Sequence, residues 1–189
     1  TGVQTCALPI YRYNKHVLED IDAFALLNAS KHQEGAFLYL PPKLAITSPI
    51  EIISIIDADV AHSWIQPRLH MFVAKHTEVE VIATTQFLQG EGSFYNAAFD
   101  IELEDEAKLS LTHVDLAGSS THSYRFDAFR ATLKRNSTFK AIQLTDSEKS
   151  RRDWKVILAG EAAEADLSGL WFLDGTKETD RKSTRLNSS

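Results

Sequence analysis

The chain has seven histidines, the residue type here best suited to bind a metal ion. His62, His70 and His76 lie closest together and are eight and six residues apart. Zinc-binding signatures such as H-E-x-x-H place their ligands on a much tighter spacing, so these histidines match none of them. His113 follows two leucines at a period of two, which predicts that its side chain points inward near a strand end. We therefore expect structural histidines and no metal site.

Two glycine-containing segments could hold a phosphate group or a nucleophile. Gly90-Glu91-Gly92 lacks the third glycine and the strand–turn–helix context of a phosphate-binding loop, so we expect a turn. Gly118-Ser119-Ser120 lacks the G-x-S-x-G pattern of a nucleophile elbow, and the nearby His122 does not replace it. The sequence thus predicts no catalytic residue, and cofactor-binding residues stay unassigned.

The elements that would position these residues recur along the chain at a nearly constant spacing. Four strand-like segments have central apolar residues at steps of 30, 30 and 28 residues, namely Val79, Leu109, Phe139 and Leu167. A second strand-like run precedes each segment at a similar period: Leu69–Val73, Ala97–Leu103, Tyr124–Phe129 and Trp154–Leu158. A strand repeat of this length is typical of a solenoid, in which each unit buries its apolar face against its neighbours. We predict an all-β fold, a single-stranded right-handed parallel β-helix with about 30 residues per turn and a short N-terminal helix.

In such a coil, equivalent residues of successive turns lie about 4.8 Å apart. The four central residues should then form one internal file, and burying each should contribute about 1.5–3 kcal/mol. Other expected elements are a helix within residues 13–29, strands at 36–40 and 49–56, a loop at 57–67, and polar turns at 132–137 and 146–152.

Carboxylates matter because β-helices often carry polysaccharide-cleaving sites, which need acidic and basic groups clustered on one face of successive coils. Aligning the repeats places Asp100 beside Arg130 and Asp115 beside Thr145, and no column of the alignment holds two acids with a basic partner. The acidic run from Asp100 to Glu106 is typical of a solvated face. A carbohydrate-active β-helix enzyme lacking its catalytic coil is therefore the alternative hypothesis.

Composition excludes several other classes. The chain is 43% hydrophobic and 24% charged with a net charge of −6, so a nucleic-acid partner, which needs a basic face, is not expected. No apolar run reaches the length of a membrane span, and the N-terminus shows no secretory signal pattern. The repeat of near thirty residues differs from the six-residue period of hexapeptide acyltransferases. We expect a cytoplasmic protein that does not contact a membrane.

Both ends of the sequence differ from the rest. The single cysteine, Cys6, excludes an internal disulfide and lies within residues 1–10, which resemble translated sequencing-adaptor read-through. Residues 181–189 have the same character and no apolar period. We expect residues 11–30 to be a short helix ending a truncated upstream region, and residues 31–180 to be a β-helix core that is truncated at its C-terminal end.

Several segments resemble proteins of the SufB/SufD family. They are FALLNA at 24–29, GAFLYLP at 35–41, SPI at 48–50, LAGEAAEADLSGL at 158–170 and DGTKETD at 174–180. The closing segments are the more specific, although Lys177 stands where the family more often has glutamine. The chain is more similar to SufD than to SufB, because the cysteine-bearing segments typical of SufB are not visible in it.

This resemblance implies a non-enzymatic scaffold subunit in a machinery that builds iron–sulfur clusters. SufD pairs with SufB through their β-helices, and both engage the ATPase SufC through C-terminal helices. The fragment itself would bind no cofactor, since the cluster forms transiently in the full complex. A family histidine that helps to form the cluster lies just beyond the aspartate matching Asp180, at Arg181 or later in this sequence, so neither this cluster residue nor the SufC-binding helices are transferred. A repeat-based binding surface of unknown ligand is a third hypothesis.

Overall fold

The computed structural model describes residues 22–58, 60–89, 91–116, 123–146, 149–173, 175 and 177–187. Sheet A contains β1 (Gly35–Leu40), β4 (Arg68–Val73), β6 (Phe94–Leu103), β8 (Tyr124–Leu133), β10 (Lys149–Leu158) and β12 (Glu178–Asn187), and the short β3 (Trp64–Ile65) pairs with β6. Sheet B contains β2 (Ile50–Asp57), β5 (Glu78–Gln89), β7 (Lys108–Leu116), β9 (Thr138–Asp146) and β11 (Glu164–Trp171). The helix is α2 (Ala23–Lys31).

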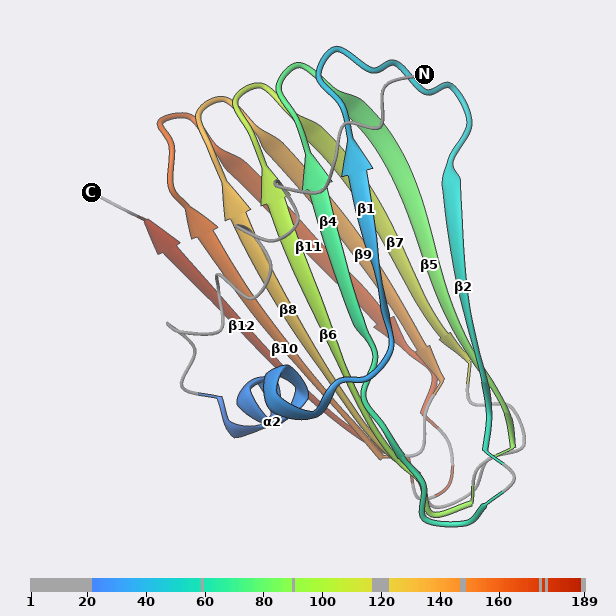
Figure 1. Ribbon diagram of the computed structural model, residues 1–189. Coiled ribbons are helices and arrows are strands. Elements are labelled where there is room, and N and C mark those ends of the chain that lie inside the picture. Colours follow the sequence, from blue (N-terminus) through green and yellow to red (C-terminus); the bar gives the residue numbers. More distant parts are fainter. Residues whose placement is uncertain are drawn as a thin grey trace, which may run out of the picture.

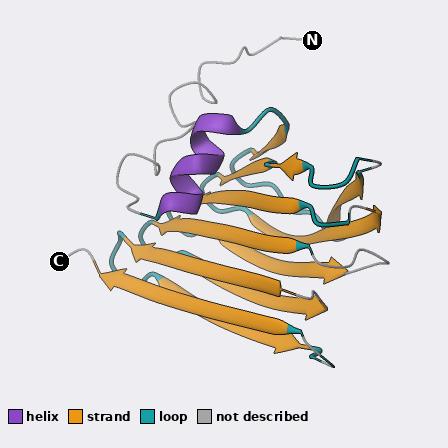
Figure 2. Cartoon of the chain, turned by 90° about the horizontal axis from the view of Figure 1, so that it is seen from below, coloured by secondary structure: helices purple, strands orange, loops and turns teal. Residues whose placement is uncertain are grey.

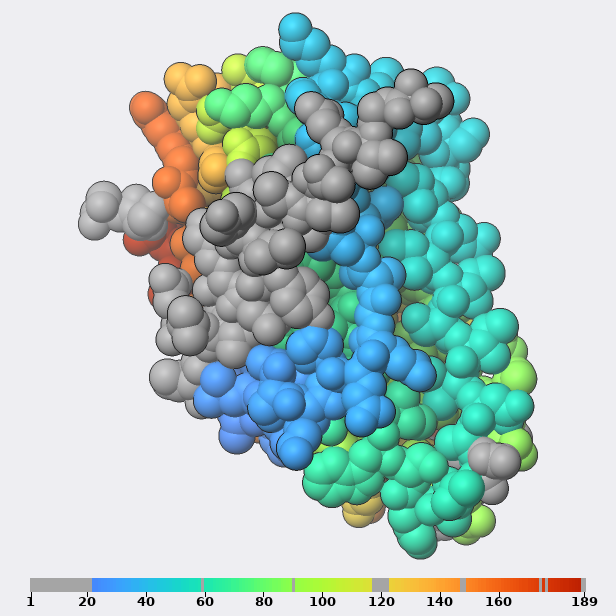
Figure 3. Space-filling view, in the orientation of Figure 1, coloured from blue at the N-terminus to red at the C-terminus, as the bar shows by residue number. Residues whose placement is uncertain are grey.

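The chain alternates between the two sheets and climbs by one strand per turn in each of them. Every strand pair is parallel. In Figure 1 the two sheets lie as facing layers, and in Figure 3 the sequence colours run in order across the molecule. The result is a β-solenoid of about five turns, which confirms the predicted fold class.

The internal file is confirmed for three of its four predicted members. Val79 pairs with Leu109, and Leu109 pairs with Phe139. The fourth assignment is wrong, because Ala165 lies beside Phe139 while Leu167 lies beside Ala141. The step to this coil is 26 residues, since only two residues separate β9 from β10 whereas seven separate β7 from β8. A shorter connection moves the following strand along the register, and a composition-based alignment cannot detect that shift.

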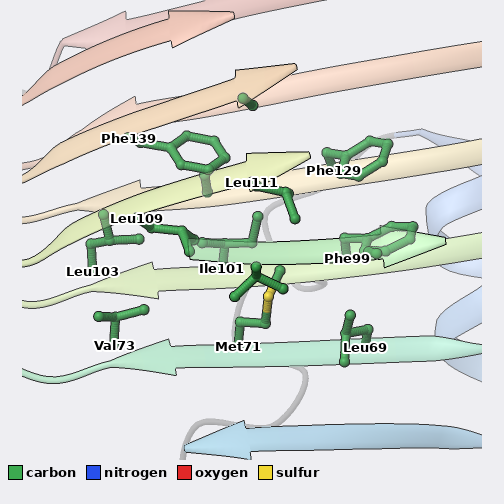
Figure 4. Packing of buried hydrophobic residues seen from close by; sticks show 14 of the residues in the cluster. Leu69, Met71, Val73, Phe99, Ile101, Leu103, Leu109, Leu111, Phe129 and Phe139 are labelled. Atoms are coloured by element: carbon green, nitrogen blue, oxygen red, sulfur yellow. The ribbon is translucent and has the colours of Figure 1, made fainter. Parts of the chain in front are cut away.

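The interior between the sheets is filled mainly by aliphatic and aromatic side chains. Figure 4 shows Leu69, Met71 and Val73 of β4 in contact range of the corresponding residues of β6. Leu109 and Leu111 of β7 point into the same core, and each is about 1% exposed, as the alternating pattern of this strand predicts. This stacking gives each coil an apolar face that only its neighbours can cover.

The turns that lead from sheet A to sheet B repeat one backbone conformation. His76, Glu106, Asn136 and Ala162 all have φ between 55° and 59°. The turns are also joined to each other, because the N–H of Glu106 donates to the carbonyl of Arg135 at 2.9 Å and that of Asn136 to the carbonyl of Glu161 at 2.9 Å. Each turn therefore continues the pairing of the strands that it connects.

Several predicted boundaries need correction. Thr132 and Leu133 still belong to β8, so the turn predicted at 132–137 begins two residues later than predicted. The predicted turn at 146–152 is wrong over 149–152, which form the start of β10 and pair with β8. Ser150 and Arg152 are buried there despite their polarity, because they face other polar groups inside the solenoid. The loop predicted at 57–67 contains β3.

Helix α2 packs on the outer face of sheet A (Figure 2). It begins after Asp22, whose carboxylate accepts hydrogen bonds from the backbone N–H groups of Phe24 and Ala25, a typical N-cap. The ring of Phe24 stacks on Phe126 of β8 at a centroid distance of 4.0 Å. The helix was predicted within 13–29 and extends to Lys31; residues before 22 lie outside the described residues.

Candidate functional site

The interior of the solenoid changes in chemistry from one end of its strands to the other. Near the turns that follow sheet A, the inward positions are aliphatic, such as Val73, Leu103 and Leu133. Toward the opposite end the inward positions become polar or charged while remaining buried: Thr85, Tyr95, Asp115, Arg125, Asp127, Thr145, Ser150 and Arg152. Charged groups are rarely buried unless they are paired, so this end is the candidate functional site.

Four charged side chains form its centre, and we call them the interior quartet: Asp115, Arg125, Asp127 and Arg152. Asp115 of β7 accepts hydrogen bonds from the guanidinium groups of both Arg125 and Arg152. Arg152 also lies 2.7 Å from a carboxylate oxygen of Asp127, its register neighbour on β8. Their side chains are at most 3% exposed. Two carboxylates and two guanidinium groups balance in charge, which offsets the cost of burying them.

Strand alternation explains how the quartet assembles. Asp115 lies six residues after Leu109 on β7, and Asp127 lies two residues before Phe129 on β8. Because side chains alternate between the two faces of a strand, both aspartates point inward like those core residues. Because β7 belongs to sheet B and β8 to sheet A, the carboxylates approach each other across the interior. No single column of one sheet contains the cluster, which is why column-by-column alignment does not reveal it.

Aromatic side chains surround the quartet. The guanidinium carbon of Arg125 lies 3.8 Å from the centroid of the Phe87 ring, a cation–π contact. Tyr95 meets the edge of that ring at 5.2 Å, and burial raises the pKa of its phenol. Burial also raises the pKa of Asp127, although Arg152 opposes this effect. The cluster is buried among these groups, and its charges compensate one another inside the solenoid.

His113 lies beside the quartet and points inward as predicted. Its ring makes edge contacts with Phe99 at 5.1 Å and with Phe129 at 5.2 Å. Neither ring nitrogen has a hydrogen-bond partner among the described residues. Burial, followed by the positive charge of Arg152, lowers the pKa of His113 to about 4 against a small opposing effect of Asp115. The imidazole is therefore neutral in the folded protein at physiological pH.

This pKa predicts a specific acid sensitivity. Below pH 6.5 the unfolded chain binds a proton at His113 that the folded chain does not bind until about pH 4, so stability is lost as pH falls through this window. Replacing His113 by Phe should keep the aromatic packing and remove this loss of stability on acidification. We expect the stability difference between wild type and His113→Phe to change by about 3 kcal/mol between pH 7 and pH 4. Urea unfolding at several pH values measures it.

The matched control is His76→Asn, which removes an exposed histidine from a turn. Asp127 acts in the opposite direction, because a carboxyl with a raised pKa gains stability on acidification. Wild type and His113→Phe both contain Asp127, so its contribution cancels in the difference between their stabilities. If the free energies of unfolding of wild type and His113→Phe change in parallel with pH, the acid sensitivity does not come from His113.

The other predicted histidines do not come together. His70 lies on the outer face of sheet A against the ring of Phe37 at 5.1 Å. His76 lies 3.1 Å from Glu106 in the stacked turns, and His62 lies in a turn beside Gly92. Among the described residues, no three histidine, cysteine or acidic side chains are grouped as metal ligands. His122 and residues 118–120 lie outside the described residues, as does Gly90, while Glu91 and Gly92 form a turn.

A second charged cluster lies on the outer face of sheet A and joins it to α2. Arg68 lies 2.6 Å from Asp100, and it donates to the side chain of Asn28 at 3.1 Å. Asn28 in turn donates to the backbone carbonyl of Asn96 at 2.7 Å. Arg130 pairs with Asp153 at 2.8 Å. The contacts of Asn28 with Arg68 and Asn96 hold the helix on the sheet, whereas the Arg130–Asp153 pair joins β8 to β10.

The predicted solvated face at 100–106 is therefore wrong for residues 100–104, which are buried. Asp100 and Glu102 are 1% and 2% exposed, whereas Glu106 is exposed in a turn. Carboxylates on this sheet face can be buried because cations of adjacent coils pair with them, as Lys134 does with Glu104 at 2.7 Å. The predicted neighbours Asp100 and Arg130, and Asp115 and Thr145, are confirmed by the register.

A surface hollow of about 860 Å³ lies beside β2 and β3. Its lining includes Lys31, Glu34, Asp57 and Trp64, but it contains none of the predicted histidines and no member of the interior quartet. Among the described residues, no helix has the length and apolar character of a membrane span.

Comparison with known protein families matches residues 55–187, more than half of the chain, to "SUF system FeS cluster assembly, SufBD core domain". A search of curated proteins found no match. The matched region runs from β2 to the end of β12 and includes the whole interior quartet. It also includes residues 181–187, whose adaptor-like origin stays a prediction.

Proposed function

The chain belongs to the SufB/SufD core-domain family of the SUF iron–sulfur cluster assembly system, and we propose that it acts as a SufD-like scaffold subunit. In this role it would be non-enzymatic by itself, lie in the cytoplasm, and work with a SufB-like protein and a SufC-like ATPase. The observation that carries the proposal is the family match over a parallel β-solenoid. The alternative of a carbohydrate-active enzyme has no supporting observation.

Cysteine content favours SufD over SufB. The matched residues 55–187 contain no cysteine, and the only cysteine of the sequence is Cys6. Thiolates are the usual protein ligands of iron–sulfur clusters. A subunit without thiols in its core would support assembly while a partner supplies most ligands. The cluster is then a product of the complex, formed when nucleotide-driven motion of the ATPase reshapes the contact between the two scaffold subunits.

We assign the SufB-like partner to the β11 edge of sheet B. In the described part of the chain, β11 and β12 each lie at one end of the strand order of their sheet. The backbone N–H groups of Glu164 and Phe172 donate toward the β9 side. Because N–H groups alternate in direction along a parallel strand, those of the odd-numbered residues of β11 point to the free edge. Such an edge can add a strand from another chain.

Co-expression with SufB-like and SufC-like proteins from the same source tests this proposal. We expect a stable complex by size-exclusion chromatography with light scattering, and an iron–sulfur absorbance that persists after Cys6→Ser. Ala165→Pro should weaken the SufB-like contact about tenfold, because proline blocks the free edge while the N–H groups facing β9 remain. Ser168→Ala, on the outer face of the same strand, is the control. A monomer that binds neither partner would overturn the proposal, and loss of the cluster in Cys6→Ser would favour a SufB-like role.

A further inference from the structure

The outer face of sheet B carries an apolar surface over the middle and C-terminal parts of its strands. We call it the apolar stripe, and its members are Ile53, Ile55, Ile82, Val114, Leu116, Ile142, Leu144, Leu170 and Phe172. Six of these side chains, on four different coils, are 42% to 61% exposed, a degree that is uncommon for so many large apolar residues on one face. Sheet B forms the rear layer in Figure 1, on the side of the solenoid opposite α2.

The strand register places the members of the stripe in three adjacent rows. Ile53 pairs with Thr84, Thr84 with Val114, Val114 with Leu144, and Leu144 with Leu170, so the central row crosses all five strands and is apolar except at Thr84. One flanking row holds Ile82 and Ile142 with Thr112 between them, and the other holds Ile55 and Leu116 with Gln86 between them and Asp146 after them. Five strands spaced about 4.8 Å apart and three rows spaced about 6.7 Å apart give a surface about 19 Å long and about 13 Å wide.

The charges around the stripe are mainly acidic. Exposed carboxylates on the same sheet face are Glu51, Asp57, Glu78, Glu80, Glu164 and Asp166. The cations at this face are Lys108, Lys140 and Lys177; Lys108 already contacts Glu78 at 3.3 Å, and Lys177 already pairs with Asp146, which lies beside Leu116. A partner that covers the stripe therefore gains most if its own border is basic.

We propose that the apolar stripe binds an amphipathic helix whose aliphatic face is bordered by lysine or arginine. The width of the stripe matches the 10–12 Å diameter of a helix, and its length corresponds to about 13 helical residues. A second copy of this chain fits less well, because it would bring two acidic borders together in a protein of net charge −6. An anionic membrane surface would be repelled for the same reason. This inference is independent of the proposed SufD-like role.

A peptide pair tests the proposal on the intact chain. The probe is a fluorescein-labelled 14-residue helical peptide of leucine and lysine at amphipathic spacing, and its counterpart replaces every lysine by glutamate. Fluorescence anisotropy should show binding of the lysine peptide at least about tenfold tighter than that of the glutamate peptide. The binding should weaken as salt is raised, because charges at the border are screened.

Substitutions locate the binding site. Ile142→Thr with Leu170→Thr keeps strand-forming residues but removes apolar surface, and it should weaken binding about tenfold. Glu80→Gln with Asp166→Asn should weaken binding about threefold or more and reduce its salt dependence. The controls are Leu26→Thr, an exposed leucine on α2, and Glu178→Gln with Asp180→Asn, exposed acids on β12 of sheet A.

Each contrary outcome overturns the proposal. Equal binding of the two peptides, or equal effects of stripe and control variants, would show nonspecific adhesion. Self-association in sedimentation that is abolished by the Ile142→Thr and Leu170→Thr pair would identify a second copy as the occupant. Tighter binding to vesicles with about 30% phosphatidylserine than to the lysine peptide would identify a membrane surface. None of these experiments uses SUF partners, so their failure is distinct from failure of the SufD-like role.

Discussion

Arg152→Met is expected to destabilise the protein by about 3–5 kcal/mol, because it leaves two buried carboxylates with one guanidinium group. Arg152 is fully buried and contacts both Asp115 and Asp127. Methionine has a similar shape, so the loss would come from charge and not from a cavity. Urea unfolding at pH 7 measures the free energy of unfolding directly.

The neighbouring residue supplies the matched control. Arg151 points to the other face of β10, is 35% exposed, and lies 3.7 Å or more from its acidic neighbours. Arg151→Met should therefore cost less than about 1 kcal/mol. If Arg152→Met and Arg151→Met lower the free energy of unfolding by the same small amount, charge compensation does not stabilise the interior quartet.

Acidification distinguishes charge from packing in the same variant. Without Arg152, burial should raise the pKa of Asp127 further above its ordinary range, since Arg152 is the largest influence that lowers it. A carboxyl with a raised folded-state pKa disfavours folding once the unfolded chain ionises, so stability is recovered as pH falls. We expect the difference between Arg152→Met and wild type to shrink between pH 7 and pH 5. A difference that stays constant would indicate a packing defect.

The repeat is the part of this fold that sequence reasoning predicts well. Val79, Leu109 and Phe139 recur at a fixed step, because a solenoid needs equivalent residues at equivalent positions of each coil. The error at Leu167 arises where the connection between strands shortens. Nothing in the composition of β11 signals that shift, since its alternation is satisfied in either register.

The interior quartet cannot be predicted from the sequence because both faces of β8 carry a mixture of polar and apolar residues. One face of this strand carries Arg125 and Asp127, and the other carries Phe126 and Ala128. Reading by hydrophobicity alone would point Phe126 inward, whereas it lies under α2 and the two charged residues face the interior. Burial of both faces removes the contrast on which period-two patterns depend. A usable signal is Arg152, which alternates with the buried Trp154 and Val156 on β10.

Phe129→Ala is expected to cost about 3–5 kcal/mol and to loosen the coils on both sides of it. The ring is fully buried and lies between two parallel rings, 4.3 Å from Phe99 and 3.9 Å from Trp154. Removing it breaks an aromatic stack that joins three successive strands of sheet A, and it opens space beside His113. Hydrogen–deuterium exchange should show faster exchange in β6 and β10 than in the distant β1.

Tyr124→Ala tests whether the effect depends on the interior position. Tyr124 lies on the same strand, is 48% exposed, and should cost less than about 1 kcal/mol when truncated. In a solenoid each coil contacts only its neighbours, so a defect at Phe129 should spread through β6 and β10 before it reaches the ends. Uniform loss of protection along all the described strands would instead show that the coils unfold as one unit, with a stability set by all of them together.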